Sequence, residues 1–117
     1  MVVCFLSDLL SKRKARYESL SLMEGLNRYQ TEENAVLLDV RTPEEFSEGH
    51  IPSAVNLSHE KVEKEISSLI PDKDTAVYIY CKSGVRAKKA AESMAKQGYT
   101  KIKEIGGILD YTGRIEK

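Results

Sequence analysis

The run Thr75-Ala-Val-Tyr-Ile-Tyr80, followed directly by Cys81-Lys-Ser-Gly-Val-Arg86, carries the clearest structural signal in this chain. Its first six residues are mostly β-branched, aromatic or apolar, which is typical of a strand. An alanine-rich helix is predicted from about Arg86, and Gly98 suits the position just after a helix because it tolerates a left-handed backbone. A strand, a short polar loop and a helix in this order indicate one unit of an α/β fold.

The same alternation of apolar runs and amphipathic stretches continues on both sides of this unit. Residues 35–40 are apolar except for Asp39, which predicts a strand covered on both faces. A short strand is predicted at 54–57, and residues 101–105 alternate like a half-buried edge strand. Helix starts are predicted at three capping residues, Ser21, Thr42 and Ser58. Together these patterns predict an α/β fold with a mainly parallel sheet.

The composition is that of one small globular domain. The chain has 117 residues, of which 41% are hydrophobic and 31% charged. Eighteen Lys and Arg residues balance 18 Asp and Glu residues, so no overall basic field is available to attract nucleic acid. Two cysteines and two histidines are too few for a disulfide framework or a zinc site. These counts predict an intracellular, cytoplasmic domain with no nucleic-acid partner, no metal and no cofactor.

Residues 1–16 are predicted to be an amphipathic segment that precedes a main domain spanning 17–117. Read as a helix, the segment places four apolar residues on one face: Phe5, Leu6, Leu9 and Leu10. Basic residues follow the apolar run, which is the reverse of a secretory signal, and the run is too short for a transmembrane segment. The apolar face is predicted to pack on the domain or on a second copy, with anchoring at a membrane surface as the alternative.

The junction after Tyr80 is the best-equipped candidate site. Ligands of open parallel sheets bind at the carboxyl ends of strands, beside the starts of the following helices. Cys81 lies at such a strand end, where backbone N–H groups of the loop and the helix are expected to converge and favour the thiolate. Gly84 permits an unusual backbone conformation, while Lys82 and Arg86 add positive charge. A reactive thiolate is therefore predicted, and a buried, inert cysteine is the alternative.

Several motifs stand in a fixed order along the chain: Leu38-Asp39-Val40-Arg41, Pro43-Glu44-Glu45-Phe46, Gly49-His50-Ile51-Pro52-Ser53-Ala54-Val55-Asn56, the loop Cys81 to Arg86, and Gly106-Gly107. In this order and spacing they resemble the single-domain rhodanese (thiosulfate sulfurtransferase) family, from about Tyr17 to Arg114. The resemblance implies a rhodanese-like fold, with helices on both faces of a central, mainly parallel five-stranded sheet.

The resemblance also implies a two-step sulfur transfer with Cys81 as the nucleophile. The thiolate would attack the outer sulfur of a small anionic donor such as thiosulfate, form a persulfide, and pass that sulfur to cyanide or a thiol. The N–H groups of the loop would stabilise the thiolate and the persulfide, and its basic side chains would orient the donor. This substrate-binding loop comprises Lys82, Ser83, Gly84, Val85 and Arg86. A cysteine desulfurase and a sulfur-acceptor protein are candidate partners.

Loop length separates this chain from other enzymes of the same fold. Four residues lie between Cys81 and Arg86, as in the sulfurtransferases, whereas the related cell-cycle phosphatases and arsenate reductases carry five. The main alternative is a binding or regulatory module that keeps the fold without turnover. The intact Cys81 argues against that alternative.

The segment around Asp39 and Arg41 is predicted to support the site rather than take part in the chemistry. Arg41 is expected to pair with Asp39 or with a neighbouring carboxylate such as Glu48. His50 is expected to satisfy backbone groups in a turn and not to act as a base. Ser53 stands where the family usually has glycine.

Overall fold

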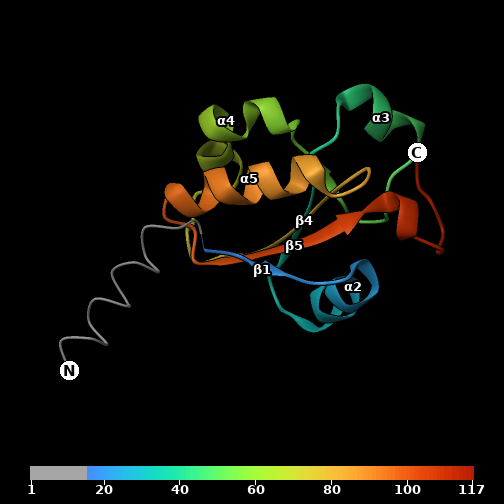
Figure 1. The fold of residues 1–117 in the computed structure, drawn as a ribbon, viewed down its shortest axis with the longest axis horizontal. Coiled ribbons are helices and arrows are strands. Elements are labelled where there is room, and N and C mark those ends of the chain that lie inside the picture. The colour runs from blue at the N-terminus through green and yellow to red at the C-terminus, as the bar shows by residue number, and fades with distance from the viewer. Residues whose placement is uncertain (1–15) are drawn as a thin grey trace.

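The computed structural model describes residues 16–117, which fold around one parallel sheet (Figure 1). In this part of the chain, five strands are paired in the order β1-β5-β4-β2-β3, and every pair is parallel. The strands are β1 (Glu18–Ser19), β2 (Val36–Asp39), β3 (Val55–Asn56), β4 (Ala76–Cys81) and β5 (Lys101–Gly107). The α-helices are α2 (Leu22–Thr31), α3 (Pro43–Glu48), α4 (Val62–Leu69) and α5 (Val85–Lys96). Two 3₁₀ turns are η1 (His59–Lys61) and η2 (Ile108–Asp110). The predicted five-stranded parallel sheet is confirmed.

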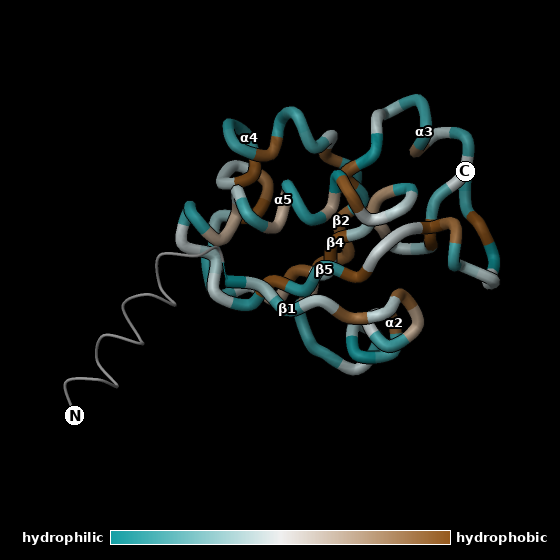
Figure 2. Tube along the Cα trace, in the orientation of Figure 1, coloured by the Kyte–Doolittle hydropathy of each residue, from teal (hydrophilic) through white to brown (hydrophobic). Residues whose placement is uncertain are grey.

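The sheet separates two apolar layers. On one face α4 and α5 cover the strands, so that Ile66 and Met94 join a core with Ile79. On the other face α2 places Leu22 and Leu26 in a second core cluster. The two helical layers lie on opposite sides of the sheet in Figure 1, and Figure 2 shows hydrophobic residues gathered along the strands between them. Coverage on both faces explains why the central strands β2 and β4 are almost wholly apolar.

β5 departs from its prediction as an edge strand, because it lies between β1 and β4 and continues through Gly107. Its outer neighbour β1 has two residues, too few to show a periodic pattern in sequence. Two polar residues of β5 contact residues of the neighbouring strands. Ser19 Oγ donates to Glu104 at 3.1 Å, and Lys103 Nζ lies over the ring of Tyr78. The alternation in this strand therefore reflects paired polar groups and not an open edge.

The predicted helix starts are correct in two cases of three. Thr42 caps α3 with a complete capping box, in which Glu45 N–H donates to Thr42 Oγ1 and Thr42 N–H donates to Glu45 Oε1. The Ser21 side chain caps α2. The predicted cap at Ser58 is wrong, because η1 intervenes before α4 and the buried Ser58 makes no capping hydrogen bond through its side chain.

Some predictions concern the start of the chain. The amphipathic segment predicted at 1–16 lies outside the described residues except for Arg16, and Cys4 also lies outside them. Within residues 16–117, no helix is both long enough and apolar enough to cross a bilayer. In the same range, no group of three or more His, Cys, Asp or Glu residues is placed to hold a metal ion.

Candidate active site

The thiol of Cys81 lies where β4 ends and the loop to α5 begins. The side chain is 1% exposed. Gly84 N–H donates to Cys81 Sγ with an N···S distance of 2.9 Å, and Ala87 N–H donates to the same atom at 3.3 Å. Ala87 belongs to the first turn of α5, whose leading N–H groups have no carbonyl of their own helix to bind. Donors of this kind, at the positive end of a helix, stabilise a negative charge on sulfur.

The end of β5 packs directly against the loop that surrounds the thiol. Gly84 has a left-handed backbone, with φ of 113°, as the sequence predicts for this position. At Gly107 a side chain would collide with the loop, because an added Cβ would lie 2.0 Å from the Lys82 carbonyl oxygen. The same carbonyl accepts a hydrogen bond from Leu109 N–H at 3.2 Å. Gly107 therefore lets β5 approach the loop closely.

Three loop residues present their side chains to solvent. Lys82 and Ser83 are exposed, and the Val85 side chain is 62% exposed. Lys82 thus places an exposed positive charge on the loop that carries the buried thiol. Val85 is the first residue of α5, where the backbone N–H has no carbonyl of the same helix to bind.

Arg86 lies in the first turn of α5 and is held by a carboxylate from α3. Its Nη1 is 2.7 Å from Glu45 Oε1, and its Nη2 is 3.1 Å from Glu45 Oε2. Hydrogen bonds from Arg86 lower the pKa of the Glu45 carboxyl to about 2, against the opposing effect of burial. The pair is bidentate and partly shielded from solvent. The sequence shows Glu45 only as part of the motif Pro43 to Phe46, and its contact with Arg86 is a finding of the structure.

Asp39 and Arg41 form a buried ion pair next to the site. Arg41 Nη2 lies 2.8 Å from Asp39 Oδ2, and the two residues are 6% and 0% exposed. Arg41 Nη2 also donates to the Gly49 carbonyl oxygen at 2.7 Å. The expected pairing with Asp39 is confirmed, and Arg41 thereby ties the end of β2 to the end of α3. Since α3 carries Glu45, this pair positions the carboxylate that meets the active-site loop.

The turn after α3 agrees with its predicted structural role. His50 Nδ1 lies 3.0 Å from the Phe46 carbonyl oxygen, and the two rings are stacked. Ser53 has a φ of 75°, a left-handed conformation that glycine adopts more readily. That geometry explains why glycine is usual at this position in the family that the sequence resembles.

Two groups near the thiol are missed by sequence reasoning. Ala87 donates to the sulfur but carries no chemical group that would mark it in a sequence. Glu104, a charged residue of the strand predicted at 101–105, is 3% exposed and accepts a hydrogen bond from Gly106 N–H at 2.6 Å. The Glu104 carboxylate thereby fixes the backbone of β5 at Gly106, next to the Gly107 that contacts the loop.

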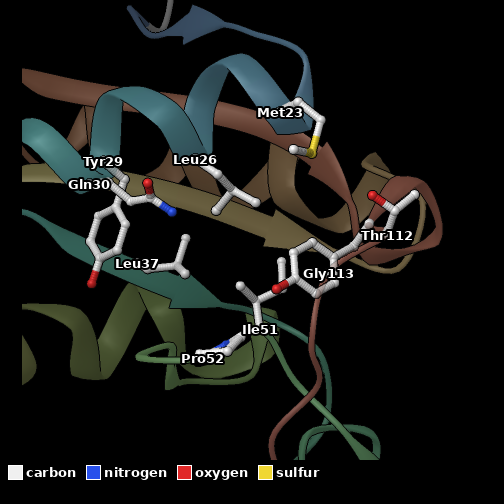
Figure 3. A pocket seen from close by; sticks show the side chains of 10 residues that line it. Met23, Leu26, Tyr29, Gln30, Leu37, Ile51, Pro52, Thr112 and Gly113 are labelled. Carbon is white, nitrogen blue, oxygen red and sulfur yellow. The ribbon is translucent and has the colours of Figure 1, made fainter.

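A cavity of about 280 Å³ lies on the face of the sheet covered by α2 (Figure 3). It is lined by residues of α2, β2, the turn at 51–52 and the C-terminal stretch: Met23, Leu26, Tyr29, Gln30, Leu37, Ile51, Pro52, Tyr111, Thr112 and Gly113. Cys81 belongs to the core cluster on the opposite face. This cavity is therefore separate from the thiol.

Comparison with known proteins shows the family of this chain. The model of the rhodanese-like domain family matches residues 22–113, which include the whole Cys81 loop. Thiosulfate sulfurtransferase PspE of Escherichia coli is 34% identical over 73 residues, covering 62% of this chain and 70% of that protein. A putative sulfur carrier protein of Bacillus subtilis, YrkF, is 35% identical over 107 residues, covering 91% of this chain but 57% of that protein.

A solved structure gives the same result in three dimensions. The structure described as rhodanese with anions from E. coli aligns with a TM-score of 0.66 at 31% sequence identity. The alignment covers 71% of this chain and 98% of that one. The fold, the loop at the end of β4 and the match over residues 22–113 place this chain in the rhodanese-like domain family.

Proposed function

We propose that this protein is a sulfurtransferase that carries sulfane sulfur as a persulfide on Cys81. The observation that carries the proposal is the thiol at the end of β4, whose Sγ accepts hydrogen bonds from Gly84 N–H and Ala87 N–H. Membership of the rhodanese-like domain family and the likeness to a thiosulfate sulfurtransferase support it.

In the first half-reaction the Cys81 thiolate attacks the outer sulfur of the donor. With thiosulfate, a bond forms between Sγ and that sulfur while the sulfur–sulfur bond of thiosulfate breaks. The electron pair of the broken bond leaves with sulfite, so a thiolate and a dianion become a persulfide anion and sulfite dianion. The loop N–H groups stabilise the negative charge before and after the transfer.

In the second half-reaction a nucleophile takes the outer sulfur of the persulfide. Cyanide gives thiocyanate, and a cellular thiolate gives a new persulfide; in each case the Cys81 thiolate leaves and is regenerated. The likeness to a putative sulfur carrier protein supports a protein acceptor, and a persulfidated cysteine desulfurase is the corresponding protein donor. No oxidant or reductant is consumed in either step.

The other loop residues act on the donor. Lys82 supplies a mobile positive charge at the rim, and Ser83 supplies a hydroxyl donor. Val85 contributes its backbone N–H, and Gly84 the turn that brings the N–H groups together. Arg86 keeps N–H groups that Glu45 does not use, namely Nε–H and one on each Nη, and these can meet a donor oxyanion.

Initial rates over a grid of donor and cyanide concentrations test this proposal, with thiosulfate in one series and methanethiosulfonate in another. A persulfide that persists between the half-reactions predicts parallel double-reciprocal lines, because the first product leaves before cyanide reacts. Intersecting lines would show a ternary complex without a covalent intermediate. If neither donor yields thiocyanate, the protein is not a sulfurtransferase for small donors, and a binding module accounts for it better.

A further inference from the structure

The pair formed by Glu45 and Arg86 brings one charge of each sign to the candidate active site. Arg86 lies between Gly84 and Ala87, whose N–H groups hold the sulfur, so its guanidinium belongs to the turn that encloses the thiol. The charge of Cys81 contributes to the raised pKa of Arg86, after the larger contribution of the hydrogen bonds to Glu45. The guanidinium is therefore within electrostatic reach of the reacting sulfur.

Glu45 is fixed in place from two sides. Its Oε1 accepts hydrogen bonds from Thr42 N–H at 3.0 Å and from Arg86 Nη1 at 2.7 Å. Its own N–H completes the capping box by donating to Thr42 Oγ1. These hydrogen bonds hold the Glu45 carboxylate beside Arg86 when the sulfur donor binds. The sulfur donor therefore meets an arginine whose charge is neutralised by Glu45.

We infer that Glu45 is a specificity-determining residue of the sulfur transfer, which neutralises Arg86 and thereby favours singly charged sulfur donors, such as organic persulfides, over doubly charged thiosulfate. This inference rests on the proposed function. An anionic nucleophile must approach an anionic donor, and the repulsion rises with the charge of the donor. The positive charge of an arginine would offset this repulsion, and would do so more for a dianion than for a monoanion. When Glu45 neutralises Arg86, the dianion therefore loses more of that compensation than the monoanion does.

Glu45→Gln tests the inference, because glutamine keeps an oxygen that can complete the capping box while it removes the negative charge. In the wild type Arg86 Nη2 donates to Glu45 Oε2. The glutamine NH₂ group at this position cannot accept that hydrogen bond, so Arg86 Nη2 loses its partner. The quantity to measure is kcat/KM for the donor, which reports the first half-reaction alone.

The expected change depends on donor charge. We expect kcat/KM for thiosulfate to rise about tenfold in Glu45→Gln, and that for methanethiosulfonate about threefold, because the electrostatic energy scales with the charge of the donor. Glu45→Ala removes the same charge without leaving an amide, and it should change the ratio of the two donors in the same direction. A purely structural role of Glu45 would change both donors by the same factor.

Two further variants separate the action of the pair from other effects. Glu44→Gln removes an equal charge from the neighbouring exposed position of α3, and it should leave the ratio of the two donors unchanged. Arg86→Ala leaves Glu45 without its counter-charge and should lower kcat/KM for thiosulfate by about tenfold. The double variant Glu45→Gln/Arg86→Ala removes both charges of the pair, so the ratio of kcat/KM for the two donors should return to that of the wild type.

The inference is overturned if Glu45→Gln and Glu45→Ala leave the preference between the two donors unchanged while the wild type transfers sulfur. It is also overturned if the double variant keeps the donor ratio of Arg86→Ala, since the charge of Glu45 would then have no effect on the choice of donor. Failure of the proposed function looks different: no variant and no wild-type protein would accept sulfur from either donor.

Discussion

Replacing Cys81 by serine is expected to reduce sulfur transfer at least about a thousandfold while the protein stays folded. A serine hydroxyl is a far weaker nucleophile at neutral pH, and it cannot form a persulfide. Its oxygen can still accept the hydrogen bonds that Gly84 and Ala87 donate to the sulfur. We therefore expect the free energy of unfolding to change by no more than about 1 kcal/mol.

The measurement is the rate of thiocyanate formation by Cys81→Ser, together with its urea unfolding curve. Cys4→Ser is the matched control, because it removes the other thiol of the chain and should keep transfer close to that of the wild type. Substantial transfer by Cys81→Ser would show that another group carries the sulfur. Loss of transfer together with loss of the folded state would leave the nucleophile to be settled by the mass measurement below.

Replacing Arg41 by methionine is expected to destabilise the protein by about 3–5 kcal/mol. Methionine keeps much of the aliphatic length of arginine but leaves the Asp39 carboxylate, which is 0% exposed, without its counter-charge. The Gly49 carbonyl oxygen at the end of α3 also loses its hydrogen bond. A loss of this size is a large part of the total stability of a typical small domain.

Arg28→Met is the control for this effect, because Arg28 pairs with Glu18 and Glu24 through a side chain that is 44% exposed. Exposed pairs of this kind contribute about 0–1 kcal/mol. The midpoint of the urea unfolding curve of Arg28→Met should therefore lie close to that of the wild type. Equal destabilisation by the two substitutions would contradict the account of Asp39 and Arg41 as a buried support of the site.

The sequence predicts well those parts of the fold that are determined by residues close together in the chain. β4, the Cys81 loop and α5 follow one another without interruption, so their order alone places the thiol at a helix start. The capping box of α3 spans only the residues from Thr42 to Glu45 and is equally local. Local patterns of this kind are visible without knowledge of the remaining chain.

The parts that sequence does not predict depend on contacts between distant segments. β5 alternates like an edge strand, and only the pairing of Ser19 with Glu104, 85 residues apart, shows why it is an inner strand. Arg86 and Glu45 lie 41 residues apart, so neither residue indicates the other. The sequence thus predicts a candidate nucleophile and its loop, whereas the carboxylate that pairs with Arg86 is brought there by tertiary structure.

The mass of the intact protein after incubation with thiosulfate or methanethiosulfonate shows whether Cys81 carries sulfur. We expect a gain equal to one sulfur atom in the wild type and in Cys4→Ser, reversed by cyanide and absent from Cys81→Ser. A gain that persists in Cys81→Ser, or no gain in the wild type with either donor, would contradict this expectation.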